Sequence, residues 1–327
     1  MNVVRVCLCL TAVALQCLVT GAAARAEDQE KQKVVGVLAN ALSMREPVLT
    51  SFLRRLSELG YVEGRNLKIE FRSAQSQPTR LPRLAQELVR LSPDAIFATN
   101  TLAAAELKRA TSTIPIVMIG NPVDADLIAD LAHPSANLTG FSLVSSELTA
   151  KRLQLLKDAV PGLKRVTVLW NPDQLWTAKS VENLRGIAPS LSLDLTHMMV
   201  RTPEDLEPTF AAIGRSNTQA LYLLESPLFF VQRSKVIGLA NRAKLPVMFG
   251  VKDLTVAGGL MSYGPSYDEM YRRSAEYIDR ILMGARPGDL PVEQPTRFEL
   301  VVNLKTARLL GIKLPQSLVQ QADDVIE

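Results

Sequence analysis

Cysteine is nearly absent from this chain of 327 residues, and its three cysteines all lie close to the N-terminus. Cys7, Cys9 and Cys17 belong to a segment that we expect to be removed on export. A disulfide framework and a thiolate metal site are therefore excluded from the chain that remains.

Residues and motifs typical of enzymes are scarce as well. The chain has only two histidines, and it lacks a GxGxxG turn after a strand, a GxxxxGK[ST] loop, a GxSxG elbow and an HExxH helix. A histidine base or a metal cluster therefore has little to draw on. We predict a protein that is not an enzyme and that uses neither cofactor nor metal.

A strong net charge is also missing. The formal charge is +4, from 37 basic and 33 acidic residues, and loss of Arg5 and Arg25 with the leader reduces it to +2. Aromatic residues make up only 5% of the chain, which argues against a surface for stacking bases. We therefore expect neither nucleic acid nor an anionic membrane as a partner.

The N-terminus has the layout of a secretory signal peptide. One early arginine precedes an apolar stretch from about Val6 to Val19, and the small-residue site Ala24-Arg25-Ala26 follows. The stretch is too short, and too closely followed by polar residues, to be a membrane anchor. We predict a signal peptide over residues 1–26, cleavage after Ala26, and a periplasmic protein that is not embedded in the membrane.

The rest of the chain alternates between strand-like and helix-like patterns. Strands are expected at 34–40, 67–73, 94–100 and 114–120, and after a transitional segment again at 165–171, 193–200, 220–226 and 245–250. Helices are expected at 45–59, 81–91, 101–111, 148–160, 178–187, 204–213 and 230–243. This order predicts an α/β fold with doubly wound parallel sheets.

The strand IPIVMIG at 114–120 returns in reduced form as LPVMFG at 245–250. Two further pairs keep the same order, VLAN with VLWN and ATN with LES, so the chain is predicted to hold two lobes of one design. Neither lobe is complete without the last region, which has a helix through Tyr271 and Leu282 and a strand at 298–303. We place the N-terminal lobe at 27–142 plus about 267–292, and the C-terminal lobe at 143–266 plus about 293–327.

Short polar side chains follow the predicted strands. Open parallel sheets bind ligands beyond the carboxyl ends of their strands, so two facing lobes can share one cleft. Amides and hydroxyls suit a small polar ligand, helix N-termini suit its carboxylate, and the acidic side chain suits an ammonium group. Helix capping is the alternative explanation for the serines, threonines and asparagines, and one side chain can do both. The candidate ligand-binding residues are Asn40, Ser43, Asn100, Thr101, Asn121, Asn171, Trp176, Glu225 and Ser226.

Several segments carry a resemblance to a known family. They are ELGYVEGRNLKIEFR (58–72), ATSTIPIV (110–117), NPVDADLIADLAHPSANLTG (121–140), GGLMSYG (258–264) and YIDRILMGARPGDLPVEQPTRFELVVNLKTARLLGIKLPQSL (277–318). In these the chain resembles the substrate-binding proteins of ABC transporters, in the group described as tryptophan/tyrosine transport components. The resemblance implies a periplasmic-binding-protein type I fold with a three-crossover hinge, and an amino-acid-like ligand enclosed by hinge closure. It also implies a membrane permease as partner.

Three other functions are compatible with a two-lobed α/β chain. A periplasmic sensor would present its ligand to a membrane histidine kinase or chemoreceptor instead of a permease. A two-domain enzyme would carry out chemistry in the cleft, and Glu225 would then be needed for turnover. A sugar-responsive repressor would need a helix-turn-helix before Val34, where the leader lies.

Overall fold

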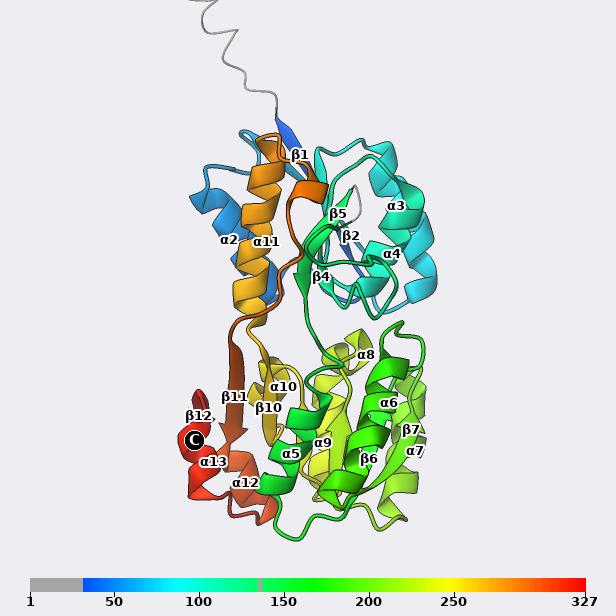
Figure 1. Cartoon of the computed structure of the whole chain (residues 1–327), viewed down its shortest axis with the longest axis vertical. Helices are drawn as coiled ribbons and strands as arrows, with labels where there is room; N and C mark the ends of the chain where they lie inside the picture. Colours follow the sequence, from blue (N-terminus) through cyan, green and yellow to red (C-terminus); the bar gives the residue numbers. More distant parts are fainter. Residues whose placement is uncertain (1–31, 135–136) are drawn as a thin grey trace, which may run out of the picture.

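The computed structural model describes residues 32–134 and 137–327, and these form two α/β lobes stacked along the long axis of the molecule (Figure 1). The predicted leader, its cleavage site and the three cysteines lie outside the described residues. Nowhere in the described ranges does a helix have both the length and the apolar character needed to cross a membrane.

The N-terminal lobe has a five-stranded parallel sheet in the order β2-β1-β3-β4-β5. Its strands are β1 (Lys33–Ala39), β2 (Leu67–Ser73), β3 (Ala95–Ala98), β4 (Ile116–Gly120) and β5 (Leu138–Ser142). Its helices are α2 (Pro47–Glu58), α3 (Leu81–Arg90), α4 (Thr101–Ala110) and α11 (Tyr267–Leu282), with short 3₁₀ turns at Pro78–Arg80 and Pro287–Asp289.

Alternation along β1 shows why both faces of this sheet are covered. Val35 and Val37 pack with α2 and α11 on one face, whereas Leu38 packs with α3 and α4 on the other. Successive side chains of a strand point to opposite faces, so an almost wholly apolar strand requires helices on both. The structure confirms a doubly wound sheet.

The C-terminal lobe has a seven-stranded sheet in the order β12-β11-β10-β9-β8-β6-β7. Its strands are β6 (Arg165–Trp170), β7 (Asp194–Met199), β8 (Ala220–Leu223), β9 (Val247–Phe249), β10 (Met261–Pro265), β11 (Phe298–Asn303) and β12 (Asp324–Ile326). Its helices are α5 (Thr149–Ala159), α6 (Thr177–Ile187), α7 (Leu206–Gly214), α8 (Pro227–Val231), α9 (Arg233–Arg242), α10 (Lys252–Val256), α12 (Leu304–Leu310) and α13 (Gln316–Gln321). Short 3₁₀ turns cover Ala188–Leu191 and Pro203–Asp205.

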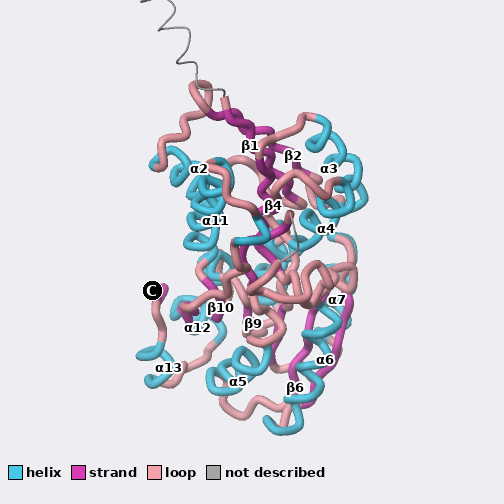
Figure 2. The backbone as a smooth tube through the Cα atoms, turned by 45° about the horizontal axis from the view of Figure 1, so that its top comes forward, coloured by secondary structure: helices cyan, strands magenta, loops and turns pink. Residues whose placement is uncertain are grey.

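The repeat seen in the sequence is a repeat of topology. The first five strands of each lobe, β1 to β5 and β6 to β10, share the order 2-1-3-4-5. The repeated sequences VLAN and VLWN, ATN and LES, and VMIG and VMFG therefore mark the first, third and fourth strands of their lobes. Figure 2 shows the two groups of strands one above the other, with helices around each.

The chain passes between the lobes three times. It leaves β5 for α5, returns from β10 to α11, and goes back from the turn at 287–289 to β11. Helix α11 packs with α2 in the N-terminal lobe, although it follows a strand of the other sheet (Figure 1). The three crossovers implied by the resemblance are thus confirmed.

Some elements differ from the prediction. The transitional segment contains β5, and the helix predicted at 230–243 covers all of α9 and only the end of α8, which is a separate helix. Strand β11 pairs with β10 in the antiparallel direction. It does so because the third crossover brings the chain in from the other lobe. Strand β11 therefore starts next to the last residue of β10 and runs back along it.

Candidate functional site

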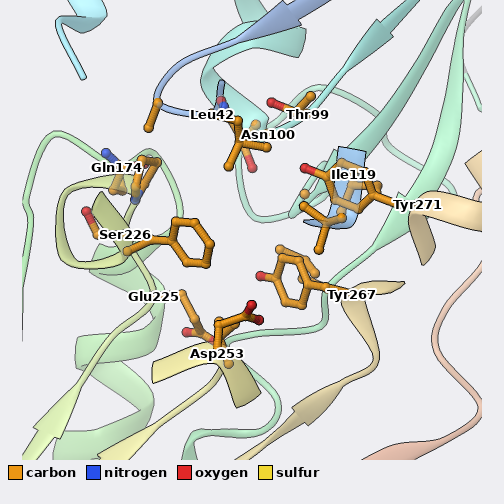
Figure 3. A pocket seen from close by; sticks show the side chains of 18 of the residues that line it. Leu42, Thr99, Asn100, Ile119, Gln174, Glu225, Ser226, Asp253, Tyr267 and Tyr271 are labelled. Carbon is orange, nitrogen blue, oxygen red and sulfur yellow. The ribbon is translucent and has the colours of Figure 1, made fainter. Parts of the chain in front are cut away.

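A pocket lies between the carboxyl ends of the two sheets, and we call it the central pocket (Figure 3). It encloses about 780 Å³ free of protein atoms, part of it open to solvent. Its walls follow β1, β3 and β4 in one lobe and β6, β8 and β9 in the other, with two tyrosines from α11. The lining residues are Ala41, Leu42, Val48, Thr99, Asn100, Thr101, Ile119, Gly120, Leu143, Gln174, Trp176, Glu225, Ser226, Pro227, Phe230, Val251, Asp253, Tyr267 and Tyr271.

Five of the nine candidate residues line the central pocket, namely Asn100, Thr101, Trp176, Glu225 and Ser226. Two of them also cap helices. The Asn100 side chain accepts a hydrogen bond from the Ala103 amide at 3.0 Å, and Ser226 accepts one from the Leu228 amide at 3.2 Å. Capping and pocket lining therefore coincide at these positions.

The other four candidates, Asn40, Ser43, Asn121 and Asn171, are not among the lining residues. Asn40 is buried after β1, and Ser43 is exposed. Asn121 and Asn171 are buried in the turns that follow β4 and β6.

Asn121 and Asn171 shape the loops around the pocket. The Asn121 amide donates to Thr101 Oγ1 at 3.0 Å, and its side-chain oxygen accepts from the Ser145 amide in the first crossover at 3.1 Å. The side-chain oxygen of Asn171 accepts from the Asp173 amide at 2.9 Å. This turn leads directly to Gln174 and Trp176, both of which face the pocket.

Among the residues that the structure describes, the wall from the N-terminal lobe carries no charged side chain. It combines aliphatic residues with the neutral polar groups of Thr99, Asn100 and Thr101. Thr99 is 7% exposed, and its Oγ1 has no hydrogen-bond partner in the described parts of the chain. The adjoining helix α4 presents its N-terminal amides, with partial positive charge, to the same wall.

The wall from the C-terminal lobe contains a buried ion pair. Arg152 on α5 is completely buried, and its Nη2 lies 2.6 Å from Oε1 of Glu225, whose side chain is 9% exposed. Arg152 Nε also donates to the Tyr263 carbonyl at 2.6 Å. Arg152 thus holds one carboxylate oxygen of Glu225, while the other, Oε2, has no partner among residues 32–134 and 137–327.

Burial and charge act in opposite directions on the groups of this cluster. Burial lowers the pKa of Arg152, but Glu225 and the neighbouring Tyr222 raise it by more, so the guanidinium stays charged. Burial raises the pKa of Tyr222 to about 12. At physiological pH Arg152 is therefore charged and the phenol of Tyr222 is neutral.

Two glycines make room for the ion pair. A Cβ atom on Gly250 would lie 2.0 Å from Glu225 Oε1, and one on Gly264 would lie 2.0 Å from the Gly250 carbonyl oxygen. Non-bonded atoms in proteins do not approach a Cβ atom this closely. The carboxylate can therefore lie against the backbone only because positions 250 and 264 lack a side chain.

A second carboxylate, Asp253 at the start of α10, lines the same wall. Its side chain forms no hydrogen bond or ion pair with other residues that the structure describes. Among the residues that the structure describes, no lysine, arginine or histidine lines the central pocket. The C-terminal wall therefore carries the negative charge of the site.

Aromatic side chains from both lobes line the central pocket. Trp176 and Phe230 line it from the C-terminal lobe, and Tyr267 and Tyr271 project into it from α11 (Figure 3). Burial raises the pKa of Tyr267 and of Tyr271, which keeps both hydroxyls neutral. The pocket thus offers flat apolar surfaces for a ring next to a negatively charged end.

Sequence reasoning did not select Thr99, Gln174, Asp253, Tyr267 or Tyr271. Asp253 follows the VMFG strand by three positions, so a longer search past each strand end would have found it. The two tyrosines carry no such signal. They reach the pocket only because the chain crosses back to the N-terminal lobe at α11.

Comparisons with known proteins connect the fold to a family. Residues 43–326 match the family described as ABC transporter substrate binding protein. A curated tyrosine-binding protein of Clostridioides difficile is 26% identical over 290 residues, which cover 88% of this chain and 83% of that protein.

Solved structures share the same two-lobed arrangement. A conserved domain protein from Vibrio cholerae overlays with a TM-score of 0.83 at 28% identity, over 90% of this chain and 100% of that one. A Streptococcus pneumonia ABC domain in complex with L-Trp gives a TM-score of 0.83 at 24% identity, with the same coverage. These likenesses show the type I periplasmic-binding fold.

Proposed function

The chain belongs to the family of ABC transporter substrate-binding proteins, and on this premise we propose that it captures an aromatic L-amino acid in the central pocket. One observation carries the choice of ligand. Glu225 and Asp253 line the same pocket as Trp176 and Phe230. Among the described residues, the buried Oε2 of Glu225 has no hydrogen-bond partner and no cation lines the pocket. The relative from Clostridioides difficile, by its name, binds tyrosine.

The proposed ligand lies across the pocket with its two charged groups on opposite walls. Its ammonium group bonds to Glu225 Oε2 and Asp253 on the C-terminal wall. Its carboxylate faces Thr99 and the N-terminal amides of α4. The ring lies among the aromatic side chains, so binding excludes water from the apolar surfaces.

Because these contacts come from both lobes, we propose that binding favours a closed arrangement through the three crossovers. A ligand that touches both walls has a higher affinity for the arrangement in which both are in reach. The moving bodies are residues 27–142 with about 267–292, and 143–266 with about 293–327. The packing of α11 with α2 supports this division.

The proposed role is in transport. After cleavage near Ala26, the protein acts in the periplasm and delivers its ligand unchanged to the permease of an ABC transporter. The sensory alternative is not favoured by the comparisons, which lead to substrate-binding proteins.

Isothermal titration with the full set of L-amino acids tests the ligand, using protein purified from the periplasm of expressing cells. We expect tyrosine or tryptophan to bind most tightly, with aspartate and glutamate excluded by the charged wall. The absence of binding by every aromatic amino acid would reject the proposed ligand.

Small-angle scattering of the same sample tests closure. The radius of gyration is expected to fall when the best ligand saturates the protein, and an unchanged radius rejects hinge closure. The intact mass of the purified protein reports whether the first 26 residues have been removed.

A further inference from the structure

Tyr267 occupies a unique place among the described lining residues, because its ring packs against both lobes. It contacts the core cluster under α2 in the N-terminal lobe and also the cluster under α8 and α9 in the C-terminal lobe. In Figure 3 it projects into the central pocket between Asp253 and Tyr271.

The backbone that carries this ring is fixed on both sides. Ser266 caps α11 through the Glu269 amide at 3.5 Å, and Asp268 accepts a hydrogen bond from Ser51 on α2. Tyr267 lies between these two anchored residues, directly after the second crossover. Its ring therefore cannot swing aside without loss of contacts to both lobes.

A second, wider cavity lies behind the ring, and we call it the rear groove. It encloses about 1260 Å³ free of protein atoms, part of it open to solvent. Three residues line both spaces, namely Val48, Asp253 and Tyr267, and of these Tyr267 has by far the largest side chain.

The rear groove differs chemically from the central pocket. It is lined by cationic Arg233 and Lys252 and by anionic Asp268 and Glu299, whereas no cation lines the central pocket within the described part of the chain. It could satisfy the polar groups of a ligand longer than one amino acid. Such a ligand would have to pass the ring of Tyr267.

We propose that Tyr267 is a specificity-determining residue that separates the two cavities and excludes ligands extended from the amino group. This inference rests on the proposed function, in which the ligand's ammonium group lies at Asp253. An extension from that nitrogen runs into the ring of Tyr267, whereas an extension from the carboxylate runs toward α4. The excluded class is therefore dipeptides that have the aromatic residue in second place.

The first experiment uses Tyr267→Ala, which removes the ring that forms the partition between the central pocket and the rear groove. Titrations compare L-tyrosine with glycyl-tyrosine and tyrosyl-glycine in the wild type, Tyr267→Ala and Tyr267→Phe. We expect the preference for tyrosine over glycyl-tyrosine to fall by at least about tenfold in Tyr267→Ala only. The preference over tyrosyl-glycine is expected to stay the same in all three proteins.

An unchanged preference in a folded Tyr267→Ala protein overturns the proposal, as does a wild type that binds glycyl-tyrosine as tightly as tyrosine. Thermal unfolding by circular dichroism verifies the fold. If the alanine variant does not fold, Tyr267→Leu takes its place, because leucine keeps apolar contact with both clusters and still shortens the barrier.

A second measurement needs no amino acid, so it separates failure of the partition from failure of the proposed function. The chain has two tryptophans, and in a Trp170→Phe background only Trp176 in the pocket wall fluoresces. Acrylamide quenching of Trp176 is expected to increase in Tyr267→Ala and not in Tyr267→Phe. Equal quenching in both variants rejects the partition, whatever the ligand is.

Discussion

The two walls of the central pocket come from matching strands of matching sheets, yet they differ in charge. The N-terminal wall presents neutral hydroxyls, an amide and aliphatic side chains after β1, β3 and β4. The C-terminal wall presents two carboxylates, Glu225 after β8 and Asp253 after β9. Behind this wall, the wholly buried Arg152 pairs with Glu225. The same topology therefore supports a neutral surface in one lobe and an electrostatic one in the other.

This difference shows how the site divides its work. Burying charge is costly unless partners are fixed in advance, and the C-terminal lobe fixes them with Arg152 and with two glycines that admit the carboxylate. The N-terminal wall needs no such support because its groups are neutral. Substitutions in the two walls should accordingly differ in size and in kind.

The largest expected effect comes from breaking the ion pair. Arg152→Met leaves the Glu225 carboxylate buried without its partner, and we expect the free energy of unfolding to fall by about 3–5 kcal/mol in urea denaturation. Adding Glu225→Gln to this variant should recover much of the loss, since no buried charge then stays unpaired.

Arg55→Met is the matched control, because Arg55 pairs with Glu276 at 2.9 Å near the surface of the other lobe. Its effect on the free energy of unfolding is expected to be much smaller. If both variants lose the same free energy of unfolding, the buried ion pair contributes no more to stability than the ion pair near the surface.

The next effect concerns the second carboxylate of the C-terminal wall. Asp253→Asn keeps the shape of the side chain but removes its charge. Because Asp253 has no ion-pair partner among the described residues, the substitution leaves no cation unpaired. We expect the dissociation constant for the aromatic amino acid to rise by about 10- to 100-fold in isothermal titration.

Asp158→Asn on the exposed face of α5 should leave the dissociation constant unchanged. An Asp253→Asn protein that binds as tightly as this control would remove Asp253 from the proposed ammonium site.

High pH probes the buried phenol next to the ion pair. Burial raises the pKa of Tyr222 from 10 to about 12, so its neutral form is favoured in the folded state. The resulting stability is fully present below pH 10 and is lost as the pH rises through about 12. We expect Tyr222 to account for at most about 2–3 kcal/mol of the loss in free energy of unfolding.

Tyr222→Phe removes this group, so the fall in stability between pH 10 and about 12 should become smaller. Other buried tyrosines keep their own share of the fall. Identical pH profiles for the wild type and Tyr222→Phe would mean that Tyr222 does not contribute.

The smallest effect is expected in the neutral wall. Thr99→Val replaces the buried hydroxyl of Thr99 with a methyl group of similar size, so the one neutral hydrogen bond proposed between this residue and the ligand is lost. The dissociation constant should rise by about two- to tenfold. Thr50→Val on the exposed face of α2 is the control. A loss of affinity at Thr99 larger than that at Asp253 would reverse the proposed division between the walls.

Much of the fold could be predicted from the sequence, because buried parallel strands such as 114–120 and 245–250 are continuously apolar and are separated by amphipathic helices. Strand β5 was missed because the segment NLTGFSLVSSE mixes polar and apolar residues without a clear period. The antiparallel β11 could not be inferred from local pattern, since its direction depends on the third crossover.

The site was predictable where it follows strands, either directly or, for Trp176, in the loop after β6. Asn100, Thr101, Glu225 and Ser226 come directly after such strands, and all four line the central pocket. Arg152 and Tyr267 come from helices α5 and α11, each of which begins after a crossover between lobes. Their positions depend on tertiary packing, which no spacing in the sequence encodes.

The close approach of Gly250 to Glu225 has a practical consequence for anyone who would use this protein as a biosensor. Even an alanine methyl group at position 250 would occupy the place of Glu225 Oε1. Gly250→Ala is therefore the smallest substitution expected to abolish ligand binding. A sensor built on this protein would gain a non-responding control that differs from the active form by one methyl group.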